Sequence, residues 1–371
     1  MSLRALVVGA GPAGLAAAAR LATDCDSVTV VDAAPRERRC RVGEHLPPAG
    51  LTALAALGLA ALIDDPRHEP SPGVRSAWGD GGVTDKEYFS GLPGYGLNLR
   101  REVFDAALAR HAEGCGASLL FATRLDGLAR AGTGCAASLR SAEGRWSLPV
   151  DLVVDASGRQ ASAARRLGAK RRRLDRMVAI IGKVEGCAPV GETGRVHVES
   201  VADGWWYAVP FSNGAVIAAL CTDAACVQRH AGGAQALWRA RLAASRLLAP
   251  LVQGGEEPRR VQVVDAAGQW LDYAPGPGLL AVGDAAAAYD PLLSWGITKA
   301  LCDGHAGAEA LLRARQGDQD ALRAHRHAQL QAFRAHRSRR RAFYAAESRW
   351  PAAPFWRSNR PGTPAAAGGL R

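Results

Sequence analysis

The sequence predicts an α/β fold with three parts: a Rossmann-type domain built on a parallel sheet, an interleaved and mostly antiparallel β domain, and C-terminal helices. Three observations predict it. An apolar run, a glycine-rich turn and an alanine-rich helix fill residues 5–21. Two further apolar strands, Leu152 to Asp155 and Leu279 to Val282, end in small-residue turns, as strands that face a ligand crevice do. Alternating Val, Ile and aromatic residues between Met177 and Cys221 predict the β domain.

The glycine-rich turn carries the strongest motif. Gly9, Gly11 and Gly14 have the G-x-G-x-x-G spacing of dinucleotide-binding proteins, and the next apolar run ends at Asp32. Gly9 permits a tight turn, Gly11 lets the backbone approach a pyrophosphate, and Gly14 lets the helix pack on the strand. The helix N-terminus attracts phosphate, and the Asp32 carboxylate suits ribose hydroxyls. The alternative is a strand-turn-helix without a ligand, and the agreement of acid, spacing and position favours the dinucleotide site.

Composition narrows the class of protein. With 371 residues, 48% of them hydrophobic, the chain can bury a large core and suggests two structural domains. No apolar run reaches the roughly 18 residues that span a bilayer, and no leader segment is visible, so we expect a cytoplasmic protein. The eight cysteines are scattered without a C-x-x-C pair, which indicates reduced thiols and neither a disulfide framework nor a metal site.

The net charge of +11 is unevenly spread. Arginines and a lysine crowd Arg165 to Arg176, and a second basic cluster runs from Arg313 to Arg341. Such clusters bind nucleic acid or an acidic partner, or they form a solvated surface. No nucleic-acid-binding motif is present and aromatic residues are not interleaved with the basic ones, so the solvated surface is favoured over nucleic acid.

The first half of the chain alternates between helix and short strands. Apolar spacing predicts helices over Leu51 to Ile63 and over Leu99 to Cys115, the second closed by Gly114. The glycine-rich stretch 71–96 predicts short strands and turns. A small antiparallel layer is expected from Ser118 to Phe121, Ala136 to Leu139 and Trp146 to Leu148.

Three consecutive aromatic residues mark the β domain. On a strand, Trp206 points to the face opposite Trp205 and Tyr207. One face belongs to the core, and the other is able to line a pocket that accepts an aromatic ring. The residue pattern leaves open which face does which.

The C-terminal part is mainly helical. Helices are expected over Ala234 to Leu247, Ile297 to Arg315 and Ala321 to Ala346, the last rich in arginine. An irregular tail is expected from Trp350 to Arg371.

Three motifs occur in the order found in flavoprotein monooxygenases of the para-hydroxybenzoate-hydroxylase fold, which the chain resembles: residues 9–14, 155–159 and 283–284. More narrowly, the chain resembles the branch that contains the flavin-dependent tryptophan halogenases, and most of all the flavoproteins of cysteine-tryptophylquinone biogenesis. The narrower resemblance rests on Val42 to Pro48, Leu99 to Asp105, Gly204 to Tyr207, Asp290 to Gly296, Glu347 to Trp350 and Pro354 to Trp356.

The resemblance implies a glutathione-reductase-like domain that holds extended FAD. Its segments would be residues 1–75, 96–182 and 260–320, with a β-rich substrate domain over 76–95 and 183–259 and a basic C-terminal helix and tail over 321–371. The implied cofactor-binding residues are Gly9, Gly11, Pro12, Ala13, Gly14, Asp32, Arg41, Arg101, Gly283, Asp284, Pro291, Trp295, Gly296 and Ile297.

Within that set the resemblance divides the flavin among the residues. The N-terminal motif and Asp32 would hold the adenosine end, with Arg41 and Arg101 near the diphosphate and ribose. Asp284 would bind the ribityl chain or diphosphate. Residues 291–296 would lie along the isoalloxazine, and the following helix would point its N-terminus at the flavin, where free N–H groups stabilise negative charge.

Two departures from the halogenases bear on the reaction. Tryptophan halogenases need a lysine after the Gly-Glu motif, and residues 45–79 contain none, while Lys86 lies outside a matching context. The halogenase Trp-x-Trp-x-Ile-Pro motif appears only as Trp205 to Pro210. Chlorination is therefore disfavoured. Trp295 replaces a small or polar residue of many relatives, which suggests an enclosed flavin face or an unusual substrate.

The expected reaction is hydroxylation of an electron-rich aromatic ring by O2 through a flavin hydroperoxide, with electrons from NAD(P)H or from a separate flavin reductase. The substrate would be an indole or phenol, including a tryptophan in a peptide or partner protein that docks on the basic C-terminal helix. Halogenation, reduction of carbon–carbon double bonds and a non-catalytic FAD-binding scaffold are the alternatives.

The catalytic candidates are Glu44, His45, Trp206 and Tyr207. His45 can exchange a proton near neutral pH from a loop beside the flavin. Alternatively, Glu44 only fixes the loop through backbone N–H groups and His45 is a solvated surface residue.

Overall fold

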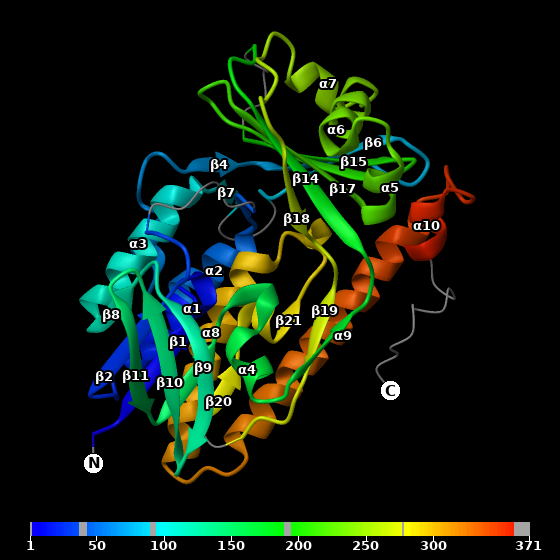
Figure 1. Ribbon diagram of the computed structural model, residues 1–371. Coiled ribbons are helices and arrows are strands. Elements are labelled where there is room, and N and C mark those ends of the chain that lie inside the picture. The colour runs from blue at the N-terminus through cyan, green and yellow to red at the C-terminus, as the bar shows by residue number, and fades with distance from the viewer. Residues whose placement is uncertain (1, 37–42, 90–93, 189–193, 277, 360–371) are drawn as a thin grey trace.

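A five-stranded parallel sheet forms the centre of the computed structural model (Figure 1), which describes residues 2–36, 43–89, 94–188, 194–276 and 278–359. The strand order is β20-β12-β1-β2-β8 and every neighbouring pair is parallel. The strands are β1 (Arg4–Val8), β2 (Ser27–Val31), β8 (Ala117–Leu120), β12 (Leu152–Asp155) and β20 (Leu279–Ala281). The Rossmann-type parallel sheet predicted from the sequence is confirmed.

β8 corrects one expectation. Residues 118–121 were expected in a small antiparallel layer, but β8 pairs in parallel with β2, with Val28 opposite Ala117. The helix α3 (Arg101–Gly114) carries the chain back over the sheet before β8 begins, and such a crossover returns a strand in parallel. The antiparallel layer instead comprises β9 (Arg124–Ala131), β10 (Gly134–Ser141) and β11 (Gly144–Val150).

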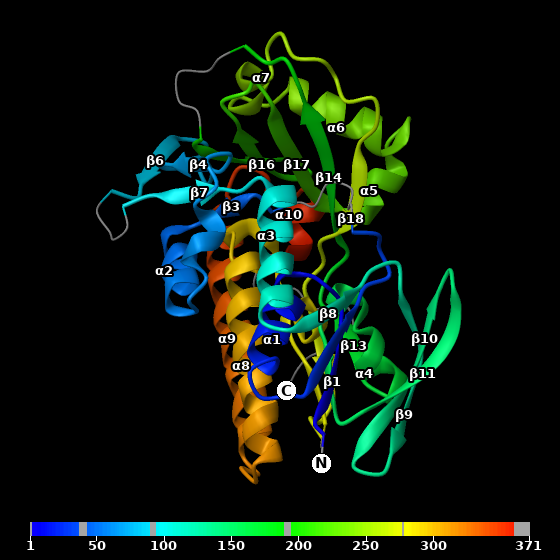
Figure 2. The same cartoon turned by 90° about the vertical axis from the view of Figure 1, so that its left-hand side faces the viewer.

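The two faces of the parallel sheet pack on different layers. Ala5 and Val7 of β1 face α1 (Pro12–Leu21), α3 and α8 (Gly296–Arg315), whereas Leu6 and Val8 face the β9–β11 sheet and α4 (Ser162–Arg166). Figure 2 shows α8 and α9 (Ala321–Ala346) to the left of β1 and the β9–β11 sheet to its right. The strand is apolar throughout because both of its faces are covered.

A seven-stranded sheet forms the second layer, at the top of Figure 1, in the order β18-β14-β17-β16-β15-β5-β6. All its pairs are antiparallel except β15 with β5. The predicted domain boundaries at residues 75, 182 and 260 fall within or beside its strands, and that division stays a prediction. The strands are β5 (Gly73–Ala77), β6 (Val83–Glu87), β14 (Met177–Val184), β15 (Val196–Val201), β16 (Gly204–Pro210), β17 (Val216–Asp223) and β18 (Gln262–Asp265).

This second sheet also has two buried faces. Trp206 and Leu220 pack beneath α6 (Gly233–Ala243) and α7 (Leu248–Leu251). The short helix α5 (Ala224–Arg229) comes before α6 in the chain. Trp205 and Cys221 lie on the other face, against the end of α9 and against α10 (Pro354–Asn359). The alternation predicted for Trp205, Trp206 and Tyr207 is confirmed.

Short elements connect the layers. They are β3 (His45–Leu46), β4 (Glu69–Ser71) and β7 (Gly96–Asn98) in one small sheet, β13 (Lys170–Arg173), β19 (Gln269–Asp272) and β21 (Ala287–Ala288) in another, and four 3-10 turns, η1 (Ala60–Ile63), η2 (Gly158–Gln160), η3 (Gly283–Ala285) and η4 (Pro291–Leu293).

Three helix boundaries differ from the predictions. The helix expected over residues 234–247 is α6, which ends four residues earlier, at Ala243. The helix expected over residues 51–63 is α2 (Pro48–Ala56) followed by η1, because Gly58 takes a φ of +70° and ends the helical path. α3 includes Gly114, and the left-handed glycine beyond its end is Gly116, with a φ of +105°.

The predicted helices over residues 297–315 and 321–346 are confirmed as α8 and α9, but the irregular tail is only partly correct. Residues 354–359 form α10, whose Phe355 and Trp356 are buried. We call residues 347–359 the C-terminal strap, because Glu347 accepts hydrogen bonds from Gly79 N and Ser200 Oγ on the seven-stranded sheet. No helix in the described part of the chain is long and apolar enough to cross a membrane.

Candidate functional site

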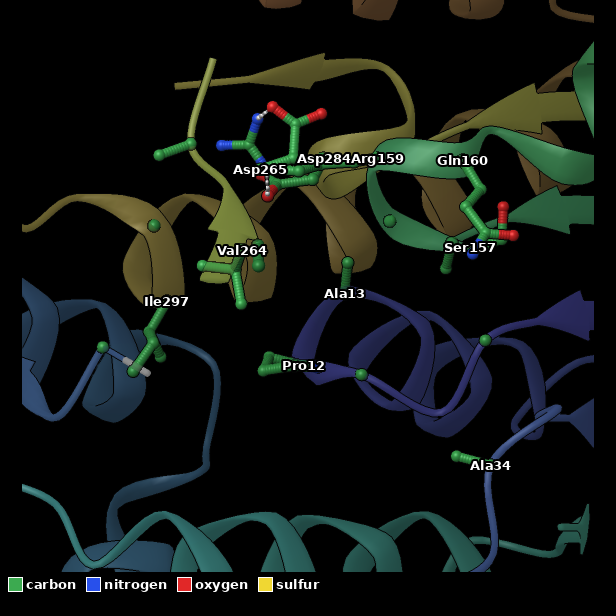
Figure 3. Close-up of a pocket in the computed structure, with 18 of the residues that line it drawn as sticks. Pro12, Ala13, Ala34, Ser157, Arg159, Gln160, Val264, Asp265, Asp284 and Ile297 are labelled. Carbon is green, nitrogen blue, oxygen red and sulfur yellow. Dashed lines mark ion pairs between the residues drawn. The ribbon is translucent and has the colours of Figure 1, made fainter. Parts of the chain in front are cut away.

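A cavity of about 770 Å³ lies between the two large sheets. Its walls come from the carboxyl ends of β1 and β2, the turns after β12 and β20, the start of α8, and the strap-facing side of the seven-stranded sheet. In Figure 3, Pro12 and Ala13 point into it from α1, opposite Val264 and Ile297. This is the edge at which parallel α/β sheets bind ligands.

The start of α1 gives one end of the cavity an unsatisfied set of donors. Gly11 is the residue before the helix and no side chain caps it. Asp32 lines the cavity, and its carboxylate accepts hydrogen bonds from Ala10 N at 2.7 Å and Ala34 N at 2.9 Å. A Cβ on Gly14 would lie 1.9 Å from Gly9 O, so Gly14 provides close packing and does not itself line the cavity.

Of the two arginines expected near the diphosphate, the structure describes one. Arg101 begins α3, is 8% exposed and lines the cavity. Its guanidinium donates to Gly43 O at 3.2 Å and to Asp105 at 3.1 Å, which fixes its direction. Arg41 lies outside the described residues.

The turns after β12 and β20 meet at Arg159. Its guanidinium lies 3.9 Å from both Asp265 and Asp284. Asp284 lines the cavity, and the ammonium group of Lys299 lies 3.6 Å from it, while burial lowers the pKa of Lys299. Gly283 does not line the cavity: its N–H donates to Asp303 and it packs on Ala13, so it holds Asp284 in place.

The segment that precedes α8 turns sharply into the cavity wall. Asp290 accepts a hydrogen bond from Leu292 N, and Ser294 has a φ of +49°, a strained value for a residue other than glycine. Pro291, Gly296 and Ile297 line the cavity as expected, and no side chain caps α8. A helix start of this kind binds anionic groups.

Trp295 departs from the expectation that it encloses the flavin. Its side chain is 38% exposed and does not line the cavity. The left-handed turn at the preceding residue, Ser294, directs the chain so that Trp295 faces outward while its neighbours line the wall.

The seven-stranded sheet supplies an apolar wall. Trp205 and Tyr207 line it from β16. Burial raises the pKa of Tyr207 well above its usual value, and its hydroxyl is itself buried, beside the His45 backbone. Small side chains on β14, β17 and the end of β18 leave room beside the two rings: Ala179, Ala219, Cys221 and Ala266.

Trp206 is not at this site, so its prediction as a catalytic residue is wrong. It is fully buried on the opposite face and packs edge-on against Trp238, with ring centroids 5.8 Å apart. Strand alternation allowed either face, and α6 covers the face that holds Trp206.

Glu44 and His45 are both buried, so the interpretation of His45 as a solvated residue is wrong. Burial raises the pKa of Glu44 to about 7. Glu44 Oε2 accepts from Gly43 N, while Oε1 has no hydrogen-bond partner among the described atoms. His45 lines the cavity but Glu44 does not.

Both nitrogens of His45 are engaged. Asn98 Nδ2 donates to Gly194 O, so Asn98 Oδ1 accepts from His45 Nδ1 at 3.1 Å. His45 Nε2 then accepts from the Tyr88 hydroxyl at 3.1 Å. Burial lowers the pKa of His45 to about 4, which keeps the ring neutral. His45 is therefore a neutral residue of the cavity wall, held in position by Asn98 and Tyr88.

The titrations of Glu44 and His45 predict opposite effects of pH on stability. Glu44, with a pKa raised from 4.5 to about 7, stabilises the fold fully below pH 4.5 and loses this contribution as pH rises to 7. His45, lowered from 6.5 to about 4, stabilises it fully above pH 6.5 and loses this contribution as pH falls to 4. The two contributions oppose each other between pH 4.5 and 6.5.

Replacement Glu44→Gln removes the first contribution. We expect the free energy of unfolding of Glu44→Gln, relative to the wild type, to rise by about 3 kcal/mol between pH 4.5 and 7.5. Urea unfolding at a series of pH values measures it, and Glu256→Gln, at an exposed position after α7, is the control because Glu256 does not act on the pKa of Glu44. Parallel curves for Glu44→Gln and the wild type would contradict the prediction.

A hydrogen-bond network behind the cavity was not predicted from the sequence. Trp205 Nε1 donates to the Tyr344 hydroxyl at 2.8 Å, which donates to Asp290 Oδ2 at 2.9 Å. The Arg340 guanidinium donates to the same carboxylate at 2.5 Å. The available signal was the four-residue spacing of Arg340 and Tyr344 on one face of a basic helix.

Gly304 was not predicted from the sequence either. A Cβ there would lie 2.1 Å from Ala13 O, so the glycine allows α8 to approach α1.

The described side chains include no group of three or more His, Cys, Asp or Glu residues able to hold a metal ion. The donors that are present suit a dinucleotide: two uncapped helix starts, one carboxylate at the end of β2 and a second carboxylate after β20.

Comparison with known proteins also indicates a dinucleotide cofactor. The FAD binding domain family matches residues 2–335. A putative FAD-dependent oxidoreductase, LodB of Marinomonas mediterranea, is 24% identical over 358 residues, which cover 96% of each chain.

Solved structures share the fold. The flavin-dependent halogenase CmlS superposes with a TM-score of 0.86 at 23% identity, over 97% of this chain and 68% of CmlS. QhpG, described as a peptidyl tryptophan dihydroxylase essential for tryptophylquinone cofactor biogenesis, has a TM-score of 0.78 at 27% identity, over 97% of this chain and 79% of QhpG.

Proposed function

The chain belongs to the FAD binding domain family and is a flavin oxidoreductase, and on that premise we propose that it is an FAD-dependent monooxygenase that hydroxylates an electron-rich aromatic ring, an indole or a phenol. Reduced FAD would activate O2, and one of its oxygen atoms would be transferred to the substrate. Electrons come from NAD(P)H or from a separate flavin reductase.

The cavity residues fit the cofactor. In the proposal, the start of α1 and Asp32 hold the pyrophosphate and the adenosine ribose, as in other dinucleotide sites. Asp284, positioned by Arg159 and Lys299, binds the ribityl chain or the diphosphate of the cofactor. The uncapped start of α8 places backbone N–H groups where negative charge on the reduced ring is stabilised.

The observation that carries the proposal is the wall around Trp205 and Tyr207. Two aromatic side chains stand beside a floor of alanine and cysteine, which suits a flat apolar ring. The apolar wall excludes water from that ring. No lysine is present among the described residues that line the cavity, which favours hydroxylation over halogenation.

A tryptophan within a peptide is the substrate we favour, because QhpG carries that activity in its description and shares the fold over nearly this whole chain. Exposed arginines of α9 offer a docking surface for an acidic peptide or partner protein: Arg334, Arg339 and Arg341. Glu44 and His45 remain candidates for proton transfer at the loop beside the cavity.

Isotope labelling tests the proposal. FAD-loaded protein, reduced with dithionite and mixed with ¹⁸O2 and indole, phenol or tryptophan-containing peptides, is expected to give a product that carries ¹⁸O. Product formed without O2 would indicate a reductase of carbon–carbon double bonds. Bound flavin that reoxidises in the presence of every substrate without product would indicate a scaffold. Either result would overturn the proposal.

β18 offers a matched pair of variants for the same assay. Val264 lines the cavity, whereas its neighbour Val263 is 48% exposed on the other face. Val264→Trp is expected to fill the aromatic space and abolish labelled product, and Val263→Trp is expected to keep it. Equal product from the two variants would place the substrate elsewhere.

A further inference from the structure

Four of the nine tryptophans lie in one continuous cluster that begins at the cavity. Trp205 lines the cavity and is 1% exposed. The ring centroid of Trp78 lies 6.4 Å from that of Trp205, Trp356 lies 5.4 Å from Trp78, and Trp350 lies 6.3 Å from Trp356. Trp78 and Trp350 are partly exposed, so the series runs from the cavity to the surface.

Tyr344 stands at the centre of this series. Its ring centroid lies 6.2 Å from Trp78 and 5.6 Å from Trp356, and its hydroxyl accepts from Trp205 Nε1. The same hydroxyl donates to the Asp290 carboxylate, which is 3% exposed. A tyrosine that can pass its proton to a carboxylate as it loses an electron becomes a neutral radical, which avoids a buried positive charge.

The indole groups of the series are also held in place. Trp78 Nε1 donates to Phe343 O at 2.7 Å, and Trp356 Nε1 donates to Val201 O at 2.8 Å. Fixed rings at contact distance favour electron transfer, because its rate falls steeply with separation. Packing alone requires neither a continuous order of oxidisable rings nor a proton acceptor at its centre.

We propose that Trp205, Tyr344, Trp78, Trp356 and Trp350 form a path that carries oxidising equivalents from the cavity to the surface. It rests on the binding of FAD in this cavity but not on the identity of the substrate. In its use, the path protects the site when no substrate is bound. Reduced FAD then reacts with O2 to give hydrogen peroxide, and hydrogen peroxide that takes one electron from a further reduced flavin splits into hydroxide and a hydroxyl radical, the one-electron oxidant.

Each step moves one electron toward the cavity. The oxidant takes one electron from Trp205 and is reduced, with the hydroxyl radical becoming hydroxide. Tyr344 returns an electron to Trp205 and its hydroxyl proton passes to Asp290. Trp78 then reduces Tyr344, which recovers the proton. A soluble one-electron reductant, such as a thiol, reduces Trp78 at the surface or reaches it through Trp356 and Trp350.

The Arg349 guanidinium lies 4.1 Å from the centroid of Trp350. A cation over a ring opposes further positive charge on that ring. Trp78 is therefore the main exit, and Trp350 extends the path as a neutral radical after loss of its indole proton. Arg340 lies 4.3 Å from the centroid of Tyr344, so Tyr344 is oxidised only as its hydroxyl proton passes to Asp290.

Flash illumination of FAD-loaded protein tests the path without turnover, because excited oxidised flavin takes an electron from a nearby aromatic ring. The wild type is expected to show loss of oxidised-flavin absorbance together with a tryptophan or tyrosine radical band. Trp205→Phe is expected to lose most of that band. Trp78→Phe is expected to form the radical but to shorten its lifetime, because the electron returns to Trp205 from the flavin.

Trp238→Phe is the matched control, since Trp238 is equally buried but packs with Trp206 on the other face of the sheet. It should leave the radical yield and lifetime unchanged. A wild type without a tryptophan or tyrosine radical overturns the proposal, even if the Trp205 variant fails to fold. So does a band that survives in Trp205→Phe, or one that is lost in Tyr207→Phe instead.

A second measurement tests protection. After repeated reduction and reoxidation without substrate, peptide mass spectrometry of the wild type should locate oxidised residues at Trp78 and Trp350. In Trp78→Phe they should move to cavity residues, such as Tyr207 and Cys221. Identical maps would overturn the protective role, and labelled product in the ¹⁸O2 assay reports separately on hydroxylation.

Discussion

Gly14→Ala is expected to abolish the retention of FAD. A Cβ at this position would lie 1.9 Å from Gly9 O and 3.1 Å from the Ala156 Cβ, so α1 must move away from β1 and β12. Overpacking of this kind costs about 3 kcal/mol when backbone has to shift. Because the same displacement moves the helix start that faces the cavity, FAD binding should weaken by about a hundredfold or more.

Flavin absorbance of the purified protein and fluorescence titration with FAD measure the effect. Gly114→Ala is the matched control, because Gly114 is also helical and a Cβ added there would meet no atom within 4 Å. That variant should bind FAD normally. Retention of a full complement of flavin by Gly14→Ala would show that the helix start does not hold the cofactor.

Asp155→Ala is expected to be the most destabilising change at a polar residue of the site. Asp155 is fully buried at the end of β12, and its carboxylate accepts from Ser157 Oγ at 2.6 Å, Ala164 N at 2.7 Å and Ser157 N at 3.1 Å. Alanine leaves these donors buried without partners. Several orphaned donors together cost about 3 kcal/mol or more.

Thermal and urea unfolding measure the change, and FAD titration shows whether the turn at Ser157, which lines the cavity, still binds. Asp272→Ala is the control: its ion pair with Arg172 is at the surface and contributes about 1 kcal/mol or less. Equal destabilisation by the two variants would contradict the role of the Asp155 carboxylate.

Elements whose signal lies within their own residues could be predicted from the sequence. The arginine-rich helix over residues 321–346 has the predicted bounds, and the glycine-rich turn lies between β1 and α1 as the motif requires. In both cases the signal, helical periodicity or glycine spacing, lies within the element itself.

The remaining features depend on contacts between distant segments. β8 reveals its partner only in three dimensions, and α10 is a short helix that depends on the burial of Phe355 and Trp356 beside Trp205. Sequence alternation could not decide between Trp205 and Trp206, because the choice depends on where α6 and the C-terminal strap pack. The neutral state of His45 likewise depends on Asn98, Tyr88 and burial.

The strand order has a consequence for biosynthesis. β1 lies beside β12, and β20 is added next to β12 only near residue 280, just before α8 covers α1. During synthesis on the ribosome, the apolar faces of the N-terminal strands therefore stay exposed until most of the polypeptide has emerged and the later elements can pack on them. Such delayed pairing slows folding and exposes the nascent chain to aggregation and to chaperones. We therefore expect FAD to bind late, after most of the chain has been synthesised.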